Sequence, residues 1–137
     1  MKDIRERRRD YLIRVALIFA TALIDSAFFL GMVLPDLTPL PPVGSGIVFM
    51  VPVLSGLMLG LLLTEESYKM RAISGLYVII VSGLIIFITL YWPVISGVAE
   101  DIGFYALWSL KWLMIAAIII TPTTLMGVLI GGSTAEY

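Results

Sequence analysis

Residues 12–34 read LIRVALIFATALIDSAFFLGMVL, an apolar stretch with Arg14 near its start and Asp25 near its middle. A helix needs about 20 apolar residues, each rising about 1.5 Å, to cross the hydrocarbon core of a bilayer. This stretch is long enough, and Pro35, which follows it directly, stops a helix. It therefore predicts a membrane-spanning helix that carries one carboxylate.

Three further apolar stretches follow at 47–63, 72–91 and 104–130, so that spans are expected at about 12–34 and at these three ranges. The first connection is rich in proline, with Pro35, Pro39, Pro41 and Pro42. The chain has 137 residues, of which 60% are hydrophobic, and a mean hydropathy of +1.04. A soluble domain of this size cannot hide so much apolar surface from water. We therefore predict a single transmembrane domain over residues 1–137, an all-α integral membrane protein folded as a four-helix transmembrane bundle.

The basic residues are distributed unevenly and predict the orientation. Eight of the nine lie on one predicted side of the spans: Lys2, Arg5, Arg7, Arg8, Arg9, Arg14, Lys69 and Arg71. Cytoplasmic loops of membrane proteins carry such an excess of Lys and Arg. Aromatic residues gather where the opposite headgroups are expected: Tyr91, Trp92, Phe104, Tyr105 and Trp108. We therefore expect cytoplasmic amino and carboxyl termini, in the plasma membrane of a prokaryote.

The composition excludes several classes of function. The chain has no Cys and no His, so it lacks disulfides, thiol chemistry, imidazole bases and the usual ligands of haem, zinc and copper. Glu65 and Glu66, near Lys69 and Arg71, form a short charged loop without a nucleophile and base beside it. We expect no enzymatic activity, no cofactor and no metal. The net charge of −1 gives no indication of a nucleic-acid partner.

Asp25 is the sharpest polar feature of the chain. Nine residues separate it from Leu34, which places it about 13 Å below the outer end of the first span and near the bilayer midplane. Because an ionised carboxylate is costly there, we expect Asp25 to be protonated, paired or facing a water-filled cavity. Thr21 and Ser26 lie close to it on the same helix and complete a small polar patch.

The sequence predicts Lys111 as an ion-pair partner for Asp25. It lies about 10 Å below Phe104 in the fourth span, at a similar depth. A second interpretation has its flexible stem extending to the outer headgroups past Trp108. Three roles for Asp25 remain open: it binds a proton or cation during transport, it stabilises helix packing through an ion pair or hydrogen bond, or it is protonated and has no special role.

Small residues form stripes in the last three spans. Gly56 with Gly60, and Gly127 with Gly131, are GxxxG motifs, and Ser-Gly recurs at Gly75 and Gly83. Such stripes let helix backbones approach closely. We favour packing within the bundle over packing between copies of the chain, because a four-helix bundle needs close internal contacts.

The segment Thr121-Pro122-Thr123-Thr124 predicts a kink in the fourth helix. Pro122 removes one N–H and clashes with the carbonyl of Ile118. Hydroxyls next to such a kink usually satisfy the freed backbone, and an ion site made of unwound backbone and the threonine hydroxyls of this segment is the less favoured alternative.

Two hypotheses for the function remain open. The first is a non-catalytic subunit of a larger membrane complex, in which Asp25 and the glycine faces dock neighbouring helices. The second is a small homo-oligomeric transporter or channel, in which Asp25 binds a proton or cation and Lys111 modulates it. The expected partners are the lipid bilayer, other membrane subunits or further copies of the chain. Anionic lipids are expected to contact the basic amino-terminal side chains: Arg5, Arg7, Arg8 and Arg9.

Overall fold

The computed structural model of the chain describes residues 3–34, 45–63 and 67–135. Within these ranges the chain forms four helices: α1 (Ile4–Val33), α2 (Ser45–Leu62), α3 (Tyr68–Ile95) and α4 (Ile102–Ala135). The prediction of an all-α protein with four helices is confirmed. The predicted proline-rich loop, together with Glu65 and Glu66, lies outside the described residues.

Three of the described helices are long and apolar enough to cross a membrane: Ile4–Val33, Tyr68–Ile95 and Ile102–Ser133. The described apolar part of α2, Phe49–Leu62, is shorter. All of α2 has 18 residues and is about 27 Å long, against a hydrocarbon core of about 30 Å. The structure therefore indicates a membrane location, with three candidate spans in the described residues.

The helices extend beyond the predicted spans at several ends. α1 begins at Ile4, where the carboxylate of Asp3 accepts a hydrogen bond from the Ile4 N–H at 2.7 Å. The charged segment thus continues the apolar helix outward, as expected for i,i+4 pairs of opposite charge. α3 continues past Pro93, and Gly97 follows its end with φ +77°, a left-handed conformation that favours glycine.

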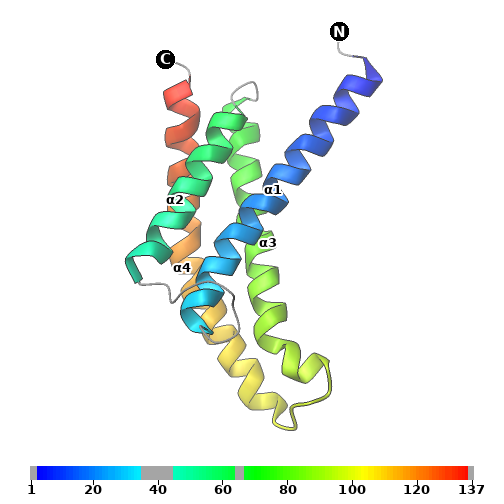
Figure 1. Cartoon of the computed structure of the whole chain (residues 1–137), viewed down its shortest axis with the longest axis vertical. Coiled ribbons are helices and arrows are strands. Elements are labelled where there is room, and N and C mark those ends of the chain that lie inside the picture. The colour runs from blue at the N-terminus through cyan, green and yellow to red at the C-terminus, as the bar shows by residue number, and fades with distance from the viewer. Residues whose placement is uncertain (1–2, 35–44, 64–66, 136–137) are drawn as a thin grey trace.

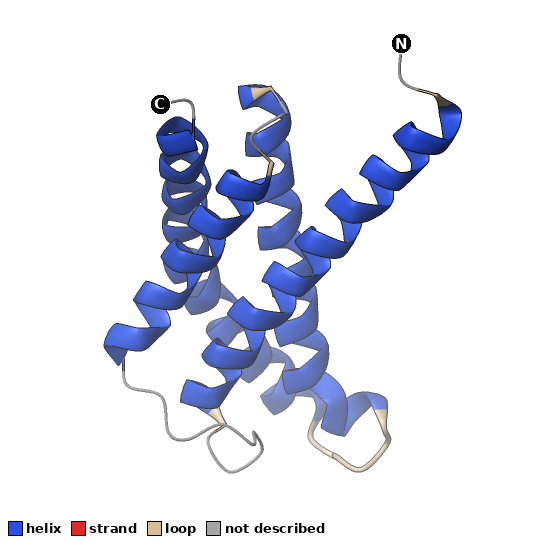
Figure 2. Ribbon diagram, turned by 45° about the horizontal axis from the view of Figure 1, so that its top comes forward, coloured by secondary structure: helices blue, strands red, loops and turns tan. Residues whose placement is uncertain are grey.

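α4 runs the length of the molecule (Figure 1). α2 packs along the second half of α4, α3 packs on α4 from another side, and α1 lies across α2 and α3. Both views show α1 diverging from the other helices toward its amino-terminal end (Figure 2). Both termini lie at this end of the molecule, and the end of α3 and the start of α4 lie at the other.

Two buried apolar clusters hold α1 against the other helices. One lies toward the end without the termini and consists of Phe29, Leu30, Ile86, Leu90, Ala116, Ile119 and Ile120. The other consists of Ile18, Ala22, Leu59, Leu63, Val78 and Val128. On α1, Asp25 lies between Ala22 of one cluster and Phe29 of the other. The polar site is therefore enclosed by apolar packing on both sides.

Candidate functional site around Asp25

Asp25 on α1 is 1% exposed and accepts hydrogen bonds from two other helices. The Ser55 hydroxyl on α2 donates to Oδ1 at 2.6 Å, and the Thr124 hydroxyl on α4 donates to Oδ2 at 3.4 Å. The first bond is short, and the second is longer than the usual range for a hydroxyl donor. We call Asp25, Ser55 and Thr124 the Asp25 group. It joins three helices at a single carboxylate.

The spacing of buried residues along α1 explains why Asp25 points inward. Ile18, Ala22, Asp25 and Phe29 follow one another at intervals of three or four residues, and all are buried. Residues with this spacing lie on one face of a helix. Asp25 is therefore part of the face that α1 buries against the rest of the chain.

The glycines of α2 and α4 bring Ser55 and Thr124 together. A Cβ at Gly56 would lie 2.6 Å from the carbonyl oxygen of Thr124, and a Cβ at Gly60 would collide with that of Val128. The contacts are reciprocal, because a Cβ at Gly127 would meet the carbonyl oxygen of Val53, and one at Gly131 that of Leu57. We call these four glycines the α2–α4 seam. Its backbone contacts fix the spacing between Ser55 and Thr124.

The seam uses both GxxxG motifs inside the chain, which is the use that the sequence favoured. Gly75 and Gly83 pack less tightly. A Cβ at Gly75 would lie 3.3 Å from the side chain of Leu125, and one at Gly83 would lie 3.5 Å from that of Leu113. Both neighbours are side chains rather than backbone. The seam glycines and Asp25 are buried within the chain, so these close contacts are made inside it.

Thr21 and Ser26 belong to the buried surface of α1 but bond their own helix. The Thr21 hydroxyl donates to the carbonyl of Leu17 at 2.7 Å, and the Ser26 hydroxyl donates to that of Ala22 at 2.7 Å. Bonds of this kind, to the carbonyl four residues earlier, are common for Ser and Thr in membrane helices. The two residues therefore surround Asp25 without holding its carboxylate.

Lys111 lies far from the Asp25 group. Thr124, which bonds Asp25, comes thirteen residues after Lys111 on α4, a distance of about 20 Å along the helix. The Lys111 side chain is exposed, and its ammonium lies 5.8 Å from the centroid of the Trp112 ring. The structure does not bring Lys111 to Asp25, and its exposure fits the interpretation in which it extends away from the bundle.

The helix continues through the Thr-Pro-Thr-Thr segment. α4 is helical from Ile102 to Ala135 with Pro122 inside it, and its axis changes direction along its length (Figure 1). The Thr123 hydroxyl donates to the carbonyl of Ile119. Thr121 is half-buried and Pro122 is exposed. Because the backbone is not unwound here, the alternative of an ion site lacks the carbonyls that it needs.

Ser55 is the partner that sequence reasoning missed. In the sequence, Ser55 directly precedes Gly56, which is one of the four seam glycines. Its hydroxyl also lies 3.2 Å from the carbonyl of Pro52, as an alternative acceptor. Thr124 belongs to the segment that the sequence singled out, although its role was expected to be local.

Arg71 is a second residue whose position differs from the expectation. It is 4% exposed, and its Nη1 donates to the carbonyl of Gly132 at 3.4 Å. A Cβ at Gly132 would lie 2.8 Å from Cζ of Arg71. A cation at this place complements the carbonyl end of α4. Arg71 therefore ties the start of α3 to the end of α4, in addition to contributing to the charge asymmetry.

The Asp25 group offers one carboxylate and two hydroxyls. Among the described residues, His, Cys, Asp and Glu form no cluster of three or more. Calcium and magnesium require about six or more oxygen ligands, so this group is short of a complete cation site. The arrangement can orient three helices. The Asp25 carboxylate can also bind a proton. Its partner Ser55 lines an almost wholly apolar groove of about 380 Å³ between α1 and α2.

Comparison of the chain with protein-family models, with curated proteins and with solved structures found no match. In the structure, the buried carboxylate is bound within the chain, and the first turns of α1 lie away from the other helices.

Proposed function

We propose that the protein is a non-catalytic subunit of a larger membrane complex, in which it packs against the helices of partner proteins. In this proposal it crosses the plasma membrane of a prokaryote four times, with both termini in the cytoplasm. The observation that carries the proposal is the divergence of the first turns of α1 from the other helices (Figure 2). The later part of α1 is held against the bundle at the Asp25 group, so the first turns project outward.

The first turns of α1 lack a neighbouring helix among the described residues. Ile4 is 71% exposed and Leu12 is 65% exposed, although both are large and apolar. In proteins, most of the stability of a helix comes from tertiary packing of its apolar face. A partner protein that covers these turns would stabilise them. The surface at which the chain meets a partner is therefore expected on α1.

Two small residues extend this surface into the membrane. Ala16 and Ala20 are exposed and lie four residues apart, so they share one face of α1. Small residues with this spacing let a second helix approach closely in lipid. They support a partner helix that packs along α1.

The distribution of charge supports the orientation. The described basic residues Arg5 to Arg14, Lys69 and Arg71 belong to the segments near the end that holds both termini. The aromatic contacts between Phe104, Tyr105 and Trp108 lie near the start of α4, at the other end. By the positive-inside rule the first end faces the cytoplasm.

We expect an affinity-tagged chain, extracted gently from its own membrane, to bring down other polypeptides in a fixed ratio. The double substitution Ala16→Trp/Ala20→Trp should remove them, because two bulky rings prevent close approach of a partner helix. Ile118→Trp, at a 71% exposed position on α4, is the matched control and should retain them. Equal recovery of the partners by both variants would show that α1 is not the docking surface.

One observation favours a second candidate function, a homo-oligomeric transporter or channel that uses Asp25 for protons or cations. Ser55 lines the groove between α1 and α2, and its hydroxyl also donates to Asp25. The Ser55 hydroxyl therefore connects the buried carboxylate to the groove. This candidate requires several copies to enclose a pathway.

Flux measurements separate the two candidates. Under the subunit proposal, we expect liposomes with the wild-type chain to conduct protons no faster than empty liposomes, and Asp25→Asn to leave this unchanged. Proton or cation flux through the wild type that Asp25→Asn abolishes, with assembly intact, would instead support the transporter.

A further inference from the structure

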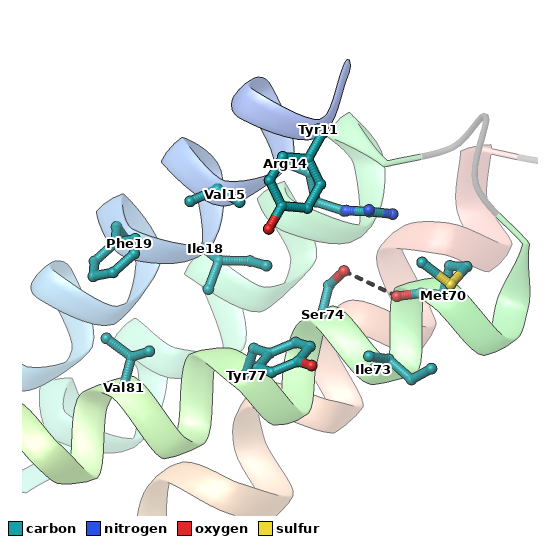
Figure 3. A pocket seen from close by; sticks show the side chains of 10 residues that line it. All are labelled: Tyr11, Arg14, Val15, Ile18, Phe19, Met70, Ile73, Ser74, Tyr77 and Val81. Atoms are coloured by element: carbon teal, nitrogen blue, oxygen red, sulfur yellow. Dashed lines mark hydrogen bonds between the residues drawn. The ribbon is translucent and has the colours of Figure 1, made fainter. Parts of the chain in front are cut away.

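A second groove, between α1 and α3, lies beside the point where α1 diverges (Figure 3). It has a volume of about 430 Å³, within the range of about 300–1,000 Å³ that is typical of small-molecule sites. One wall comes from residues 11–19 of α1 and the other from residues 70–81 of α3. The groove is open, and its two ends differ in chemistry.

Arg14 and Tyr11 form the polar end. The guanidinium of Arg14 extends between the two helices (Figure 3), and its Cζ lies 5.8 Å from the centroid of the Tyr11 ring. Ser74 faces this end from α3, with its hydroxyl donating to the carbonyl of Met70. Tyr77 brings a second phenol to the same wall. A guanidinium beside a phenol suits an anion with oxygen atoms.

Ile18, Phe19 and Val81 form the apolar end. Ile18 and Phe19 lie four and five residues beyond Arg14, or about 6–8 Å further along α1. Arg14 is also the last charged residue before the apolar part of α1 that contains Asp25. We therefore expect the groove to cross the level at which lipid headgroups give way to acyl chains.

We propose that this groove binds one anionic phospholipid, with its phosphate at Arg14 and an acyl chain along Ile18, Phe19 and Val81. The occupant must be an anion at one end and apolar at the other, at headgroup depth, and a phospholipid has all three properties. Basic pockets between helices on the cytoplasmic side bind such headgroups. Residues 3–14 carry five arginines against three carboxylates, so the surrounding charge also favours an anion. This inference does not depend on a partner subunit.

Native mass spectrometry of the full chain in detergent tests the site with phosphatidylglycerol and phosphatidylcholine of the same acyl chains. We expect one phosphatidylglycerol to bind in preference to phosphatidylcholine. Arg14→Gln should reduce that preference about fivefold, as expected for one basic residue at a membrane surface. Arg14→Lys should keep it, and so should Arg5→Gln, whose side chain is outside the groove.

Filling the apolar end of the groove with a bulky side chain tests the lipid site independently of Arg14. Val15→Trp, at a half-buried position in the wall of the groove, should abolish binding of both lipids. If that variant fails to fold, Val81→Phe closes the groove from α3 and should give the same result. Equal binding of the two lipids, an unchanged preference in Arg14→Gln, or a dimer that Val15→Trp dissociates would each overturn the proposal.

Discussion

Gly131→Ala is expected to destabilise the folded chain by about 3 kcal/mol or more, although it adds a single methyl group. Its Cβ would collide with the carbonyl oxygen of Leu57 and lie 3.1 Å from the Cα of the same residue. Both obstacles are backbone atoms of α2, so no rotamer change relieves them. Overpacking of this kind typically costs about 1–3 kcal/mol when side chains can move, and more when they cannot.

Two glycines provide matched controls for this result. Gly83→Ala places its Cβ 3.5 Å from the Leu113 side chain, an ordinary contact, and Gly46→Ala meets nothing within 4 Å. Both should stay within about 1 kcal/mol of the wild type, because alanine is the better helix former. The free energy of unfolding of all three variants is measured in mixed micelles with increasing amounts of a denaturing detergent. Equal stabilities of Gly131→Ala and Gly83→Ala would contradict a seam in backbone contact.

Asp25→Ala is expected to destabilise the chain by about 2 kcal/mol. It removes the acceptor of two hydrogen bonds between helices, which average about 0.6 kcal/mol each in membranes and reach about 1.7 kcal/mol. It also leaves a cavity at a buried position. Ser55 can turn to the carbonyl of Pro52, whereas the buried hydroxyl of Thr124 loses its Asp25 acceptor.

The same unfolding assay compares this variant with Asp25→Asn and Glu100→Ala. Asn has nearly the same size and keeps one acceptor oxygen, so we expect it to lose less than half as much stability. Glu100 is an exposed carboxylate outside the helices, and its loss should have little effect. An Asp25→Ala variant as stable as Glu100→Ala would show that the Asp25 group does not hold α1.

Local patterns predicted the helices, because apolar length identified all four. The inward face of α1, with Ile18, Ala22 and Asp25 at helical spacing, emerges from the structure. The partners of Asp25 were not predictable in this way. Ser55 and Thr124 meet it because the α2–α4 seam fixes how those helices are rotated, which is a property of contacts far apart in the chain.

The expectation for Lys111 shows why depth alone is a poor guide. It assumed that the first and fourth spans end at the same level, so that equal distances from their outer ends bring residues together. α4 has 34 residues and is about 51 Å long, longer than the hydrocarbon core. Asp25 consequently meets Thr124, in the second half of α4, and Lys111 lies about 20 Å away from that level.

The measurement that most directly tests the role of the chain is the mass and composition of the native particle, taken gently from its own membrane. One chain has a mass of 15.1 kDa. We predict a particle that contains this chain together with other polypeptides in a fixed ratio. A particle made only of whole multiples of this chain would contradict the subunit proposal and direct attention to proton or cation flux at Asp25.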